Sequence, residues 1–226
     1  LELAPDSAGS HQWLGLVLDL RGRRDEAART LRRAEELDPL SLVVSALVGL
    51  HHAFAGEHEA ELAQARRTLE LDPPQFLGHW AVGSALQNLG RHDEAAGEHR
   101  RALDLAEGTA FLKPVLARSL ALAGQADEAR TLLGPEGQAD TSPYQAATVH
   151  LALGETSRAL ELLASAAEQR DPWIVILGVD PMMLDILRSE VATHLGVVRG
   201  YLAECRAAGA GRPVSEAILR SVHTMH

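Results

Sequence analysis

The chain has 226 residues, is 46% hydrophobic but only 4% aromatic, carries a formal net charge of −10 and contains one cysteine, Cys205. The negative charge argues against a general binder of nucleic acid or of anionic membranes. One cysteine excludes an internal disulfide framework and suits a reducing compartment, so we expect a cytoplasmic protein. No apolar stretch approaches the roughly 20 residues that a membrane span needs.

The first residues match later parts of the chain. LELAP at 1–5 is in register with EELDP at 35–39. We therefore expect residues 1–7 to be the end of a preceding repeat that is cut short.

A period of 34 residues organises most of the chain. It separates Gly22, Gly56, Gly90 and Gly124, and it also separates the prolines at 5, 39 and 73 and the Arg-Arg pairs that begin at 32, 66 and 100. A fixed period of this length is typical of a helix–turn–helix solenoid.

Each unit predicts two helices. In residues 8–41, Ser10 can cap a first helix that ends near Gly22, a suitable residue for a left-handed cap. Asp25 and Glu26 suit the positive end of a second helix, which stops at Asp38-Pro39. Leu14-Gly15, Gly22, Ala27, Leu31, Ala34 and Pro39 resemble the small and apolar positions of the tetratricopeptide repeat (TPR) family.

The resemblance implies an all-α, right-handed superhelix of helical hairpins. We expect the solenoid to cover 8–173 in five units, namely 8–41, 42–75, 76–109, 110–139 and 140–173. In the second unit, Glu61 and Thr68 occupy positions that normally hold alanine. In the fourth, which is four residues short, Pro114 predicts a kink or a late helix start. Ser142-Pro143 predicts a well-capped start for the fifth.

The pattern changes after residue 173, so 174–226 is predicted to be a C-terminal capping region with a short terminal helix. S-P-Y at 142–144, L-G-E at 153–155, P-W at 172–173, D-P at 180–181 and L-R-S at 187–189 occur together. That run resembles the end of TPR arrays in bacterial multidomain regulators. The resemblance implies an attached effector, such as a DNA-binding, nucleotide-cyclase or kinase domain.

Catalysis finds little support in the sequence. No phosphate loop, H-E-x-x-H, G-x-S-x-G or C-x-x-C motif occurs. Histidines recur in register, His11 with His79 and His52 with His150, which favours structural positions over a metal site. We predict no catalytic residue, no cofactor and no metal. The Arg-Arg pairs are interleaved with Glu and Asp, which favours a solvated, self-neutralising surface.

The TPR resemblance implies that first helices line a concave groove that binds peptides. Register then names Gln12, Leu16, Asp19, Leu50, Trp80, Ser84, Gln87, Phe111, Arg118, Tyr144 and Thr148 as groove residues. For Trp80 and Tyr144, packing between adjacent repeats is an equally good interpretation. Chaperone-binding members of the family use Lys and Asn residues of successive first helices to hold a C-terminal carboxylate. Here Gln12, Leu16, Ala46 and Leu50 occupy those positions, so we predict no such clamp.

These observations predict a protein–protein interaction or scaffolding module that binds a peptide or protein segment and regulates a larger bacterial protein. The alternative is a domain that senses a small molecule or signal and controls an attached effector. A homodimer through exposed solenoid ends is a further expectation, because a solenoid cut within a repeat exposes apolar surface.

Overall fold

The structure, a computed structural model, describes residues 7–106, 111–134, 141–173, 188–189 and 192. The chain divides into two compact units, Leu1–Val179 and Asp180–His226, and the ten helices of the described ranges lie in the first. Cys205, residues 1–6 and nearly all of the predicted capping region lie outside the described residues.

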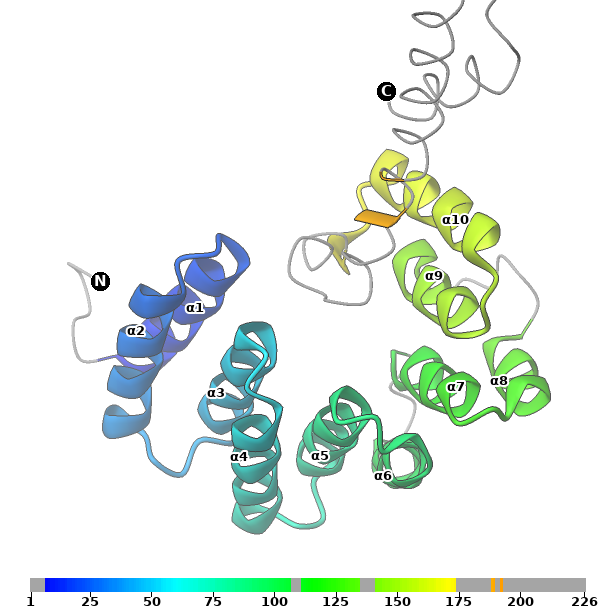
Figure 1. The fold of residues 1–226 in the computed structure, drawn as a ribbon. Coiled ribbons are helices and arrows are strands. Elements are labelled where there is room, and N and C mark those ends of the chain that lie inside the picture. The colour runs from blue at the N-terminus through cyan, green and yellow to red at the C-terminus, as the bar shows by residue number, and fades with distance from the viewer. Residues whose placement is uncertain (1–6, 107–110, 135–140, 174–187, 190–191, 193–226) are drawn as a thin grey trace, which may run out of the picture. The chain divides into compact units, whose positions relative to one another are not determined.

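The helices form five consecutive hairpins (Figure 1). The first helices are α1 (Ala8–Leu20), α3 (Leu42–Ala55), α5 (Phe76–Asn88), α7 (Leu112–Leu122) and α9 (Pro143–Ala152). The second helices are α2 (Arg24–Leu37), α4 (His58–Leu71), α6 (His92–Leu105), α8 (Ala126–Leu133) and α10 (Thr156–Glu168). No strand occurs in the described ranges, so the predicted all-α solenoid of TPR-type hairpins is confirmed.

Contacts follow the order of the chain. The second helices α2, α4, α6 and α8 each pack against their own first helix and against the first helix of the next hairpin, as α4 does with α3 and α5. First helices also contact one another, α1 with α3, α3 with α5 and α7 with α9. The first helices therefore form one layer and the second helices another, and every hairpin is stabilised by its neighbours.

The two kinds of helix begin differently. Ser7, Ser41 and Ser142 cap α1, α3 and α9, each by accepting a hydrogen bond from a backbone N–H three residues on. Ser7, not the expected Ser10, caps α1, so this helix starts earlier than predicted. The second helices α2, α4, α6 and α8 have no side-chain cap but carry acidic residues in the first turn, which the helix dipole favours.

Glycine ends the turn inside every hairpin. Gly22, Gly56, Gly90, Gly124 and Gly154 have φ of 72°, 75°, 75°, 80° and 77°. This is the left-handed region, which costs glycine little because it has no Cβ. The repeated glycines are therefore explained by one recurring turn.

The second hairpin compensates for the residues that replace alanine. Thr68 is fully buried, and its hydroxyl lies 2.7 Å from Ser45 Oγ on α3. Glu61 is 4% exposed and accepts hydrogen bonds from Asn88 Nδ2 on α5, at 3.1 and 3.0 Å. Burial raises the pKa of Glu61, although hydrogen bonds from Asn88 and His58 oppose the shift. Each buried polar group thus has a partner on a neighbouring helix.

The irregular features of the later units also follow the sequence. Pro114 is the third residue of α7, whose start at Leu112 confirms the predicted late beginning. Ser142 caps α9 and Pro143 is its first residue, as predicted. The α8 helix has only 8 residues and ends before Gly134, and the loop from 135 to 140 lies outside the described residues.

Candidate functional site

Two sides of a first helix are covered by neighbouring second helices. One side meets its own second helix: a Cβ placed on Gly83 of α5 would lie 2.5 Å from His99 Cδ2 of α6. Another side meets the preceding second helix: a Cβ on Gly78 would lie 2.6 Å from Leu69 Cα of α4. Since real Cβ atoms do not approach so closely, both sides are filled by protein. A ligand can reach only what these contacts leave open.

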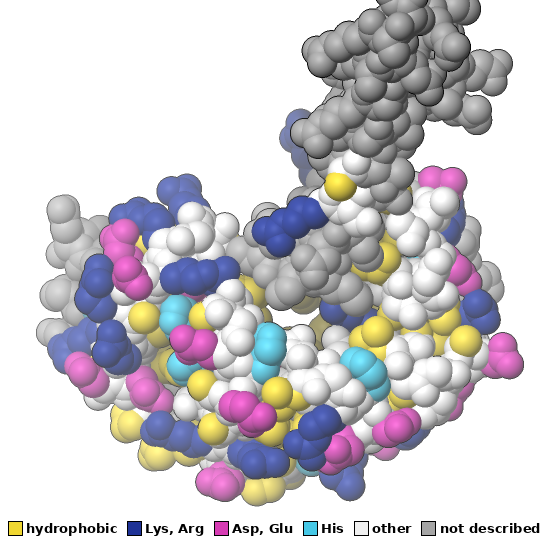
Figure 2. Space-filling view, in the orientation of Figure 1, with side chains coloured by type: hydrophobic (Ala, Val, Ile, Leu, Met, Phe, Trp, Pro, Cys, Tyr) yellow, Lys and Arg dark blue, Asp and Glu magenta, His cyan; other side chains and the backbone are white. Residues whose placement is uncertain are grey.

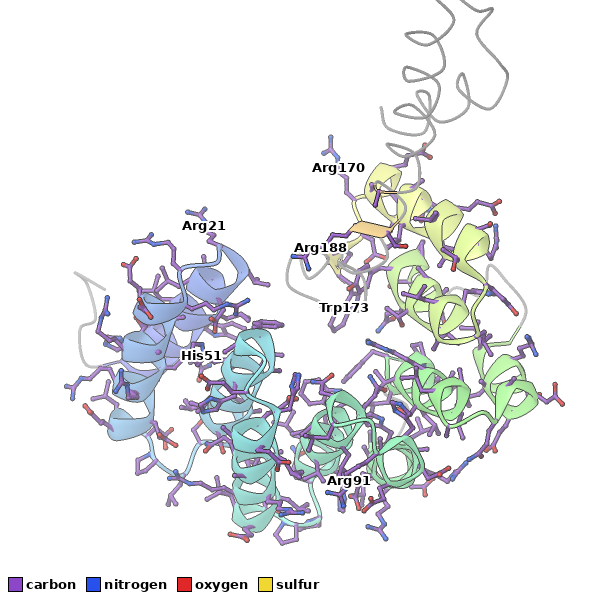
Figure 3. All side chains as sticks on the ribbon, viewed as in Figure 1. Arg21, His51, Arg91, Arg170, Trp173 and Arg188 are labelled. Carbon is purple, nitrogen blue, oxygen red and sulfur yellow. The ribbon has the colours of Figure 1, made fainter. Side chains whose placement is uncertain are left out.

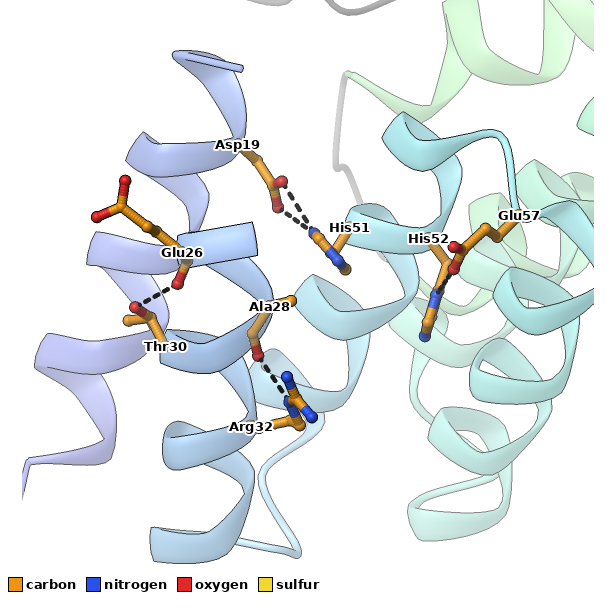
Figure 4. Close-up of polar contacts among 8 residues, drawn as sticks. All are labelled: Asp19, Glu26, Ala28, Thr30, Arg32, His51, His52 and Glu57. Atoms are coloured by element: carbon orange, nitrogen blue, oxygen red, sulfur yellow. Dashed lines mark hydrogen bonds and ion pairs between the residues drawn. The ribbon is translucent and has the colours of Figure 1, made fainter. Parts of the chain in front are cut away.

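One predicted groove row lies between neighbouring first helices. Asp19 is 1% exposed, and its carboxylate oxygens lie 2.9 and 3.0 Å from His51 Nδ1 of α3 (Figure 4). Ser119 Oγ of α7 donates to Gln87 Oε1 of α5 at 2.8 Å. The equivalent Ala53, Ala121 and Leu151 are each 8% exposed. This row joins one hairpin to the next, so we leave Asp19 and Gln87 out of the binding surface.

Burial dominates the electrostatics of Asp19. Loss of solvent raises the pKa of this carboxyl above its usual value, and the hydrogen bond and charge of His51 oppose that shift. Arg24 and His52 add weaker attractive interactions. His51 therefore offsets part of the cost of burying this carboxyl group between the first helices.

A second predicted row is also largely closed. Pro114 is fully buried and Tyr144 is 2% exposed, with the Tyr144 backbone N–H donating to Asp171 Oδ2 at 3.0 Å. Gln12 and Trp80 keep partial exposure. Trp80 packs with Phe76 and Phe111 against the cluster of Ala102, Ala106 and Leu112. Packing between repeats therefore explains the burial of Tyr144 and part of the burial of Trp80.

The third predicted row stays open over most of its length. Leu16, Leu50, Ser84 and Arg118 are partly exposed, whereas Thr148 at the end of the row is only 8% exposed. Phe111, just before α7, is partly exposed too, and its ring centroid lies 6.4 Å from that of Phe76 and 6.0 Å from that of Trp173.

A neighbouring stripe on α3 was not predicted from the sequence, apart from Leu50. Val43 is 42% exposed, and Leu47, Leu50 and Phe54 follow it at helical spacing with partial exposure. The spacing of 43, 47, 50 and 54 was the signal that could have found it. It was hidden because α3 is apolar on nearly all sides, a pattern usually typical of a fully buried helix.

We define the first-helix face as Leu16, Val43, Leu47, Leu50, Ser84, Phe111 and Arg118. The first helices are almost free of charge: α1, α3, α5, α7 and α9 together contain one acidic residue, Asp19, and two residues with permanently charged side chains, Lys113 and Arg118. In a chain of net charge −10, the acidic residues are concentrated elsewhere. The first-helix face is suited to apolar rather than cationic partners.

The second helices carry the charges as mixed pairs. Arg101 and Arg100 pair with Glu98 and Glu128, both at 2.6 Å, and Arg67 pairs with Glu35 at 3.0 Å. Figure 2 shows basic and acidic side chains interspersed rather than gathered in patches of one sign. The prediction of a self-neutralising Arg-Arg surface is confirmed.

Histidines recur as structural residues. His52 Nδ1 lies 2.7 Å from Glu57 Oε2, and His150 Nδ1 lies 2.6 Å from Glu155 Oε2, so the two matched histidines make the same contact at two hairpin turns. His79 contacts Glu98 at 2.7 Å. Across the residues that the structure describes, no three His, Cys, Asp or Glu side chains form a group able to hold a metal ion.

His99, on α6, is the most deeply buried histidine among the described residues. It is 1% exposed, and its Nδ1 lies 2.7 Å from Ser119 Oγ. Burial lowers the pKa of His99 to about 4, against a backbone hydrogen bond to Trp80, and the Arg118 charge lowers it further. The ring is therefore neutral at pH 7 and serves packing rather than proton transfer at that pH.

In the described part of the chain, none of the helices is both long and apolar enough to cross a membrane.

Similarity to known proteins is confined to distantly related solved structures. No protein-family model matches the chain, and a search of curated proteins finds no match. YrrB, described as a TPR protein with an unusual peptide-binding site, is 21% identical over 78% of this chain and 94% of its own, with a TM-score of 0.46. One MamA structure is 17% identical over 74% and 85%, with a TM-score of 0.46, and another is 24% identical over 56% and 75%, with a TM-score of 0.42.

Proposed function

We propose that the chain is a protein-interaction module whose first-helix face binds a mainly apolar segment of another protein. The observation that carries this proposal is the stripe on α3, where Val43 is 42% exposed and continues into Leu47 and Leu50. Such apolar surface in the open layer of a solenoid is typical of an interaction site, because covering it removes apolar area from water.

The charge distribution supports an apolar rather than a basic partner. No acidic side chain lies on α3 or α5, the helices at the centre of the face. Leu16 from α1 and Phe111 before α7 extend the apolar area on either side. An amphipathic helix or extended segment laid on this layer fits a recurring mode of peptide recognition.

We further propose that this interaction is regulatory and belongs to a larger bacterial protein. The support is the combination of short motifs at 142–144, 153–155, 172–173, 180–181 and 187–189, which resembles the ends of TPR arrays in bacterial regulators.

Selection of peptides on the immobilised chain tests the binding site. Peptides enriched from a random displayed library are titrated against the wild type, Val43→Glu and Leu40→Glu. Both replaced side chains are exposed, at 42% and 74%, and both variants gain one negative charge, but Leu40 lies outside the first-helix face. We expect Val43→Glu to weaken binding about tenfold or more and Leu40→Glu to change it little. Enriched peptides that are insensitive to Val43→Glu, or equally sensitive to both changes, would contradict the proposal.

A further inference from the structure

Arg118 is the one charge on an otherwise uncharged open surface. The four positions of the α3 stripe, 43, 47, 50 and 54, recur in α5 and α7 at intervals of 34 residues, and all of these side chains are exposed or partly exposed. Arg118 is the one charged residue among them, and its equivalents are Leu50 and Ser84. No Asp or Glu lies on α3, α5, α7 or α9. A carboxylate of a bound segment is therefore attracted to one place on this layer.

Aromatic rings gather near the same helix. The chain has three Phe, three Trp and two Tyr, and four of these eight residues lie around the start of α7. The Phe111 ring centroid lies 6.4 Å from that of Phe76 and 6.0 Å from that of Trp173, and Trp80 packs with Phe76 and Phe111 on one apolar cluster. Trp173 is 40% exposed. Packed aromatic rings with exposed surface are typical of residues that contribute most to binding.

A buried carboxylate positions Trp173 beside Phe111. Asp171 is 5% exposed, and its Oδ1 accepts a hydrogen bond from the Trp173 backbone N–H at 2.9 Å. Its Oδ2 accepts a hydrogen bond from the backbone N–H of Tyr144, in the first turn of α9, at 3.0 Å. Figure 3 shows Trp173 beside α9, on the side away from α8. The indole ring is thus held on the solenoid before any ligand arrives, which lowers the entropy cost of using it in binding.

The helical register sets the distance between the aromatic rings and the charge. Phe111 and Arg118 are seven residues apart, so they lie on the same side of α7, two turns and about 10 Å apart along its axis. Val115 lies between them and is partly exposed, so the path from one to the other is apolar. An extended segment covers this distance with about three residues, and a helical segment covers it with about seven.

We infer that the first-helix face selects segments of another protein in which an aromatic side chain and a carboxylate lie about 10 Å apart. The aromatic side chain packs on Phe111 and Trp173, and an Asp or Glu side chain of the segment pairs with Arg118. This inference rests on the proposed function, because it names the chemistry of the segment that the face binds. The net charge of −10 disfavours a second copy of this chain as the occupant.

Peptide selection tests this chemistry on the full chain. A random displayed library is selected on the wild type and on Arg118→Glu. On the wild type, we expect pairs of an aromatic residue with Asp or Glu, about three or seven positions apart, to become several-fold more frequent than in the unselected library. On Arg118→Glu, Lys or Arg should replace the acidic residue. Arg32→Glu, an equal change of charge at an exposed position on α2, should select the same sequences as the wild type.

Two results of the selection would overturn the inference. One is a set of wild-type sequences with no excess of the aromatic–acidic pair. The other is an unchanged preference for acidic residues on Arg118→Glu.

Titration of one enriched peptide separates binding from folding. The fluorescein-labelled peptide, a version with its acidic residue changed to the amide and a version with its aromatic residue changed to alanine are titrated against the wild type by fluorescence anisotropy. Each change should weaken binding about tenfold. Arg118→Gln should weaken the original peptide similarly but add little to the loss of the amide version, and Trp173→Ala should do the same for the alanine version. Fully additive losses would mean that these groups do not meet, which contradicts the inference.

Tryptophan emission reports whether the site is occupied. When Trp13→Phe and Trp80→Phe are combined, Trp173 is the one tryptophan left in the chain. Its emission should shift when a peptide without tryptophan binds, and an unchanged spectrum at saturation counts against the site. If a segment of the same chain fills the site, acrylamide will not quench Trp173 before peptide is added. If a second copy fills it, light scattering will show a dimer that Arg118→Glu disrupts, and either result overturns binding of another protein.

Failure of this inference is distinguishable from failure of the proposed function. Peptides that respond to Val43→Glu but not to Arg118→Gln or Trp173→Ala would retain the first-helix face as a binding site and overturn its preference for the aromatic–acidic pair. Peptides that respond to Arg118→Gln and Trp173→Ala but not to Val43→Glu would support the site on α7 and contradict the binding site proposed on α3.

Discussion

His99 shows what a single residue contributes when it interrupts an apolar repeat position. Leu31, Ala65, Leu133 and Leu163 occupy the same position in the other hairpins, and a neutral imidazole replaces them in α6. Gly83 opposite the ring leaves room for it, since a Cβ there would lie 2.6 Å from Nε2. Ser119 then supplies a polar partner from the next hairpin. Burial makes the charged form of this ring costly, so the ring stays neutral at pH 7.

This arrangement predicts loss of stability in mild acid. The pKa of His99 is about 4 in the folded chain, against an ordinary value of 6.5 for a histidine in water. The unfolded chain therefore binds the proton first, and stability falls as the pH drops from about 6.5 towards 4. The contribution of His99 to the free energy of unfolding should decrease by about 3 kcal/mol over that range.

Urea unfolding of the wild type and His99→Gln at pH 7 and pH 4.5 measures this effect. The variant keeps the raised pKa values of Asp19 and Glu61, which act in the opposite direction, so only the His99 contribution differs. The wild type should lose more stability between the two pH values than His99→Gln. An equal loss in both proteins would refute a neutral, buried His99.

Residues that contact each other across adjacent first helices match in polarity. This match is not visible when each repeat is considered separately. Asp19 with His51 is polar in both positions, and so is Gln87 with Ser119. The equivalent pairs are Ala53 with Ala85 and Ala121 with Val149, which are apolar in both positions. Matching across adjacent repeats would have placed Asp19 and Gln87 inside the array, because buried polar groups need partners.

At the scale of helices, the sequence predicted the elements well because each has its own start and stop signals. The 34-residue period, the turn glycines and the acidic first turns are local, so they need no knowledge of packing. The α1 start was predicted too late because Ser7 and Ser10 both suit a cap, and only packing distinguishes them.

The space beside a repeated glycine, by contrast, varies with the side chain that faces it, and this gives a testable contrast. Gly49 and Gly83 are equivalent, yet a Cβ on Gly49 would lie 3.9 Å from Gln64 Cγ, whereas one on Gly83 would lie 2.5 Å from His99 Cδ2. Gly49→Ala should therefore stabilise the chain by about 0.5–1 kcal/mol through helix propensity. Gly83→Ala should destabilise it by about 1–3 kcal/mol through overpacking.

Thermal and urea unfolding of the two variants measures the contrast, and each serves as the control for the other. Equal effects of the same sign at both positions would show that the two glycines have equal space beside them. The close contact between Gly83 and the His99 side chain would then be wrong.

For the whole molecule, the type of fold could be predicted from the sequence but the binding surface only in part. A period of 34 fixes which helices are neighbours. The period does not fix how far each helix is rotated about its own axis. That rotation decides whether a side chain such as Asp19 or Val43 is exposed. Leu50, Ser84 and Arg118, which register predicts to be groove residues, are partly exposed, whereas Val43 and Trp13 were recognised only from their exposed fractions of 42% and 58%.

In a solenoid of this kind, a destabilising substitution should lower stability mainly in the helices near it. The α5 helix contacts α3, α4 and α6, while α9 contacts α7, α8 and α10. The free energy of unfolding is then close to a sum of contributions from each hairpin and from each interface between neighbouring hairpins. Strain in one hairpin should therefore destabilise that hairpin and its neighbours more than distant ones. Gly83→Ala should raise amide hydrogen exchange in α4, α5 and α6 and leave α9 and α10 near the wild-type rate. Mass spectrometry of peptic fragments can locate the change, with Gly49→Ala as the variant that should slow exchange in α3 and α4. Equal acceleration of all ten helices would mean that the chain opens as one cooperative unit, because a global opening raises every amide's exchange together.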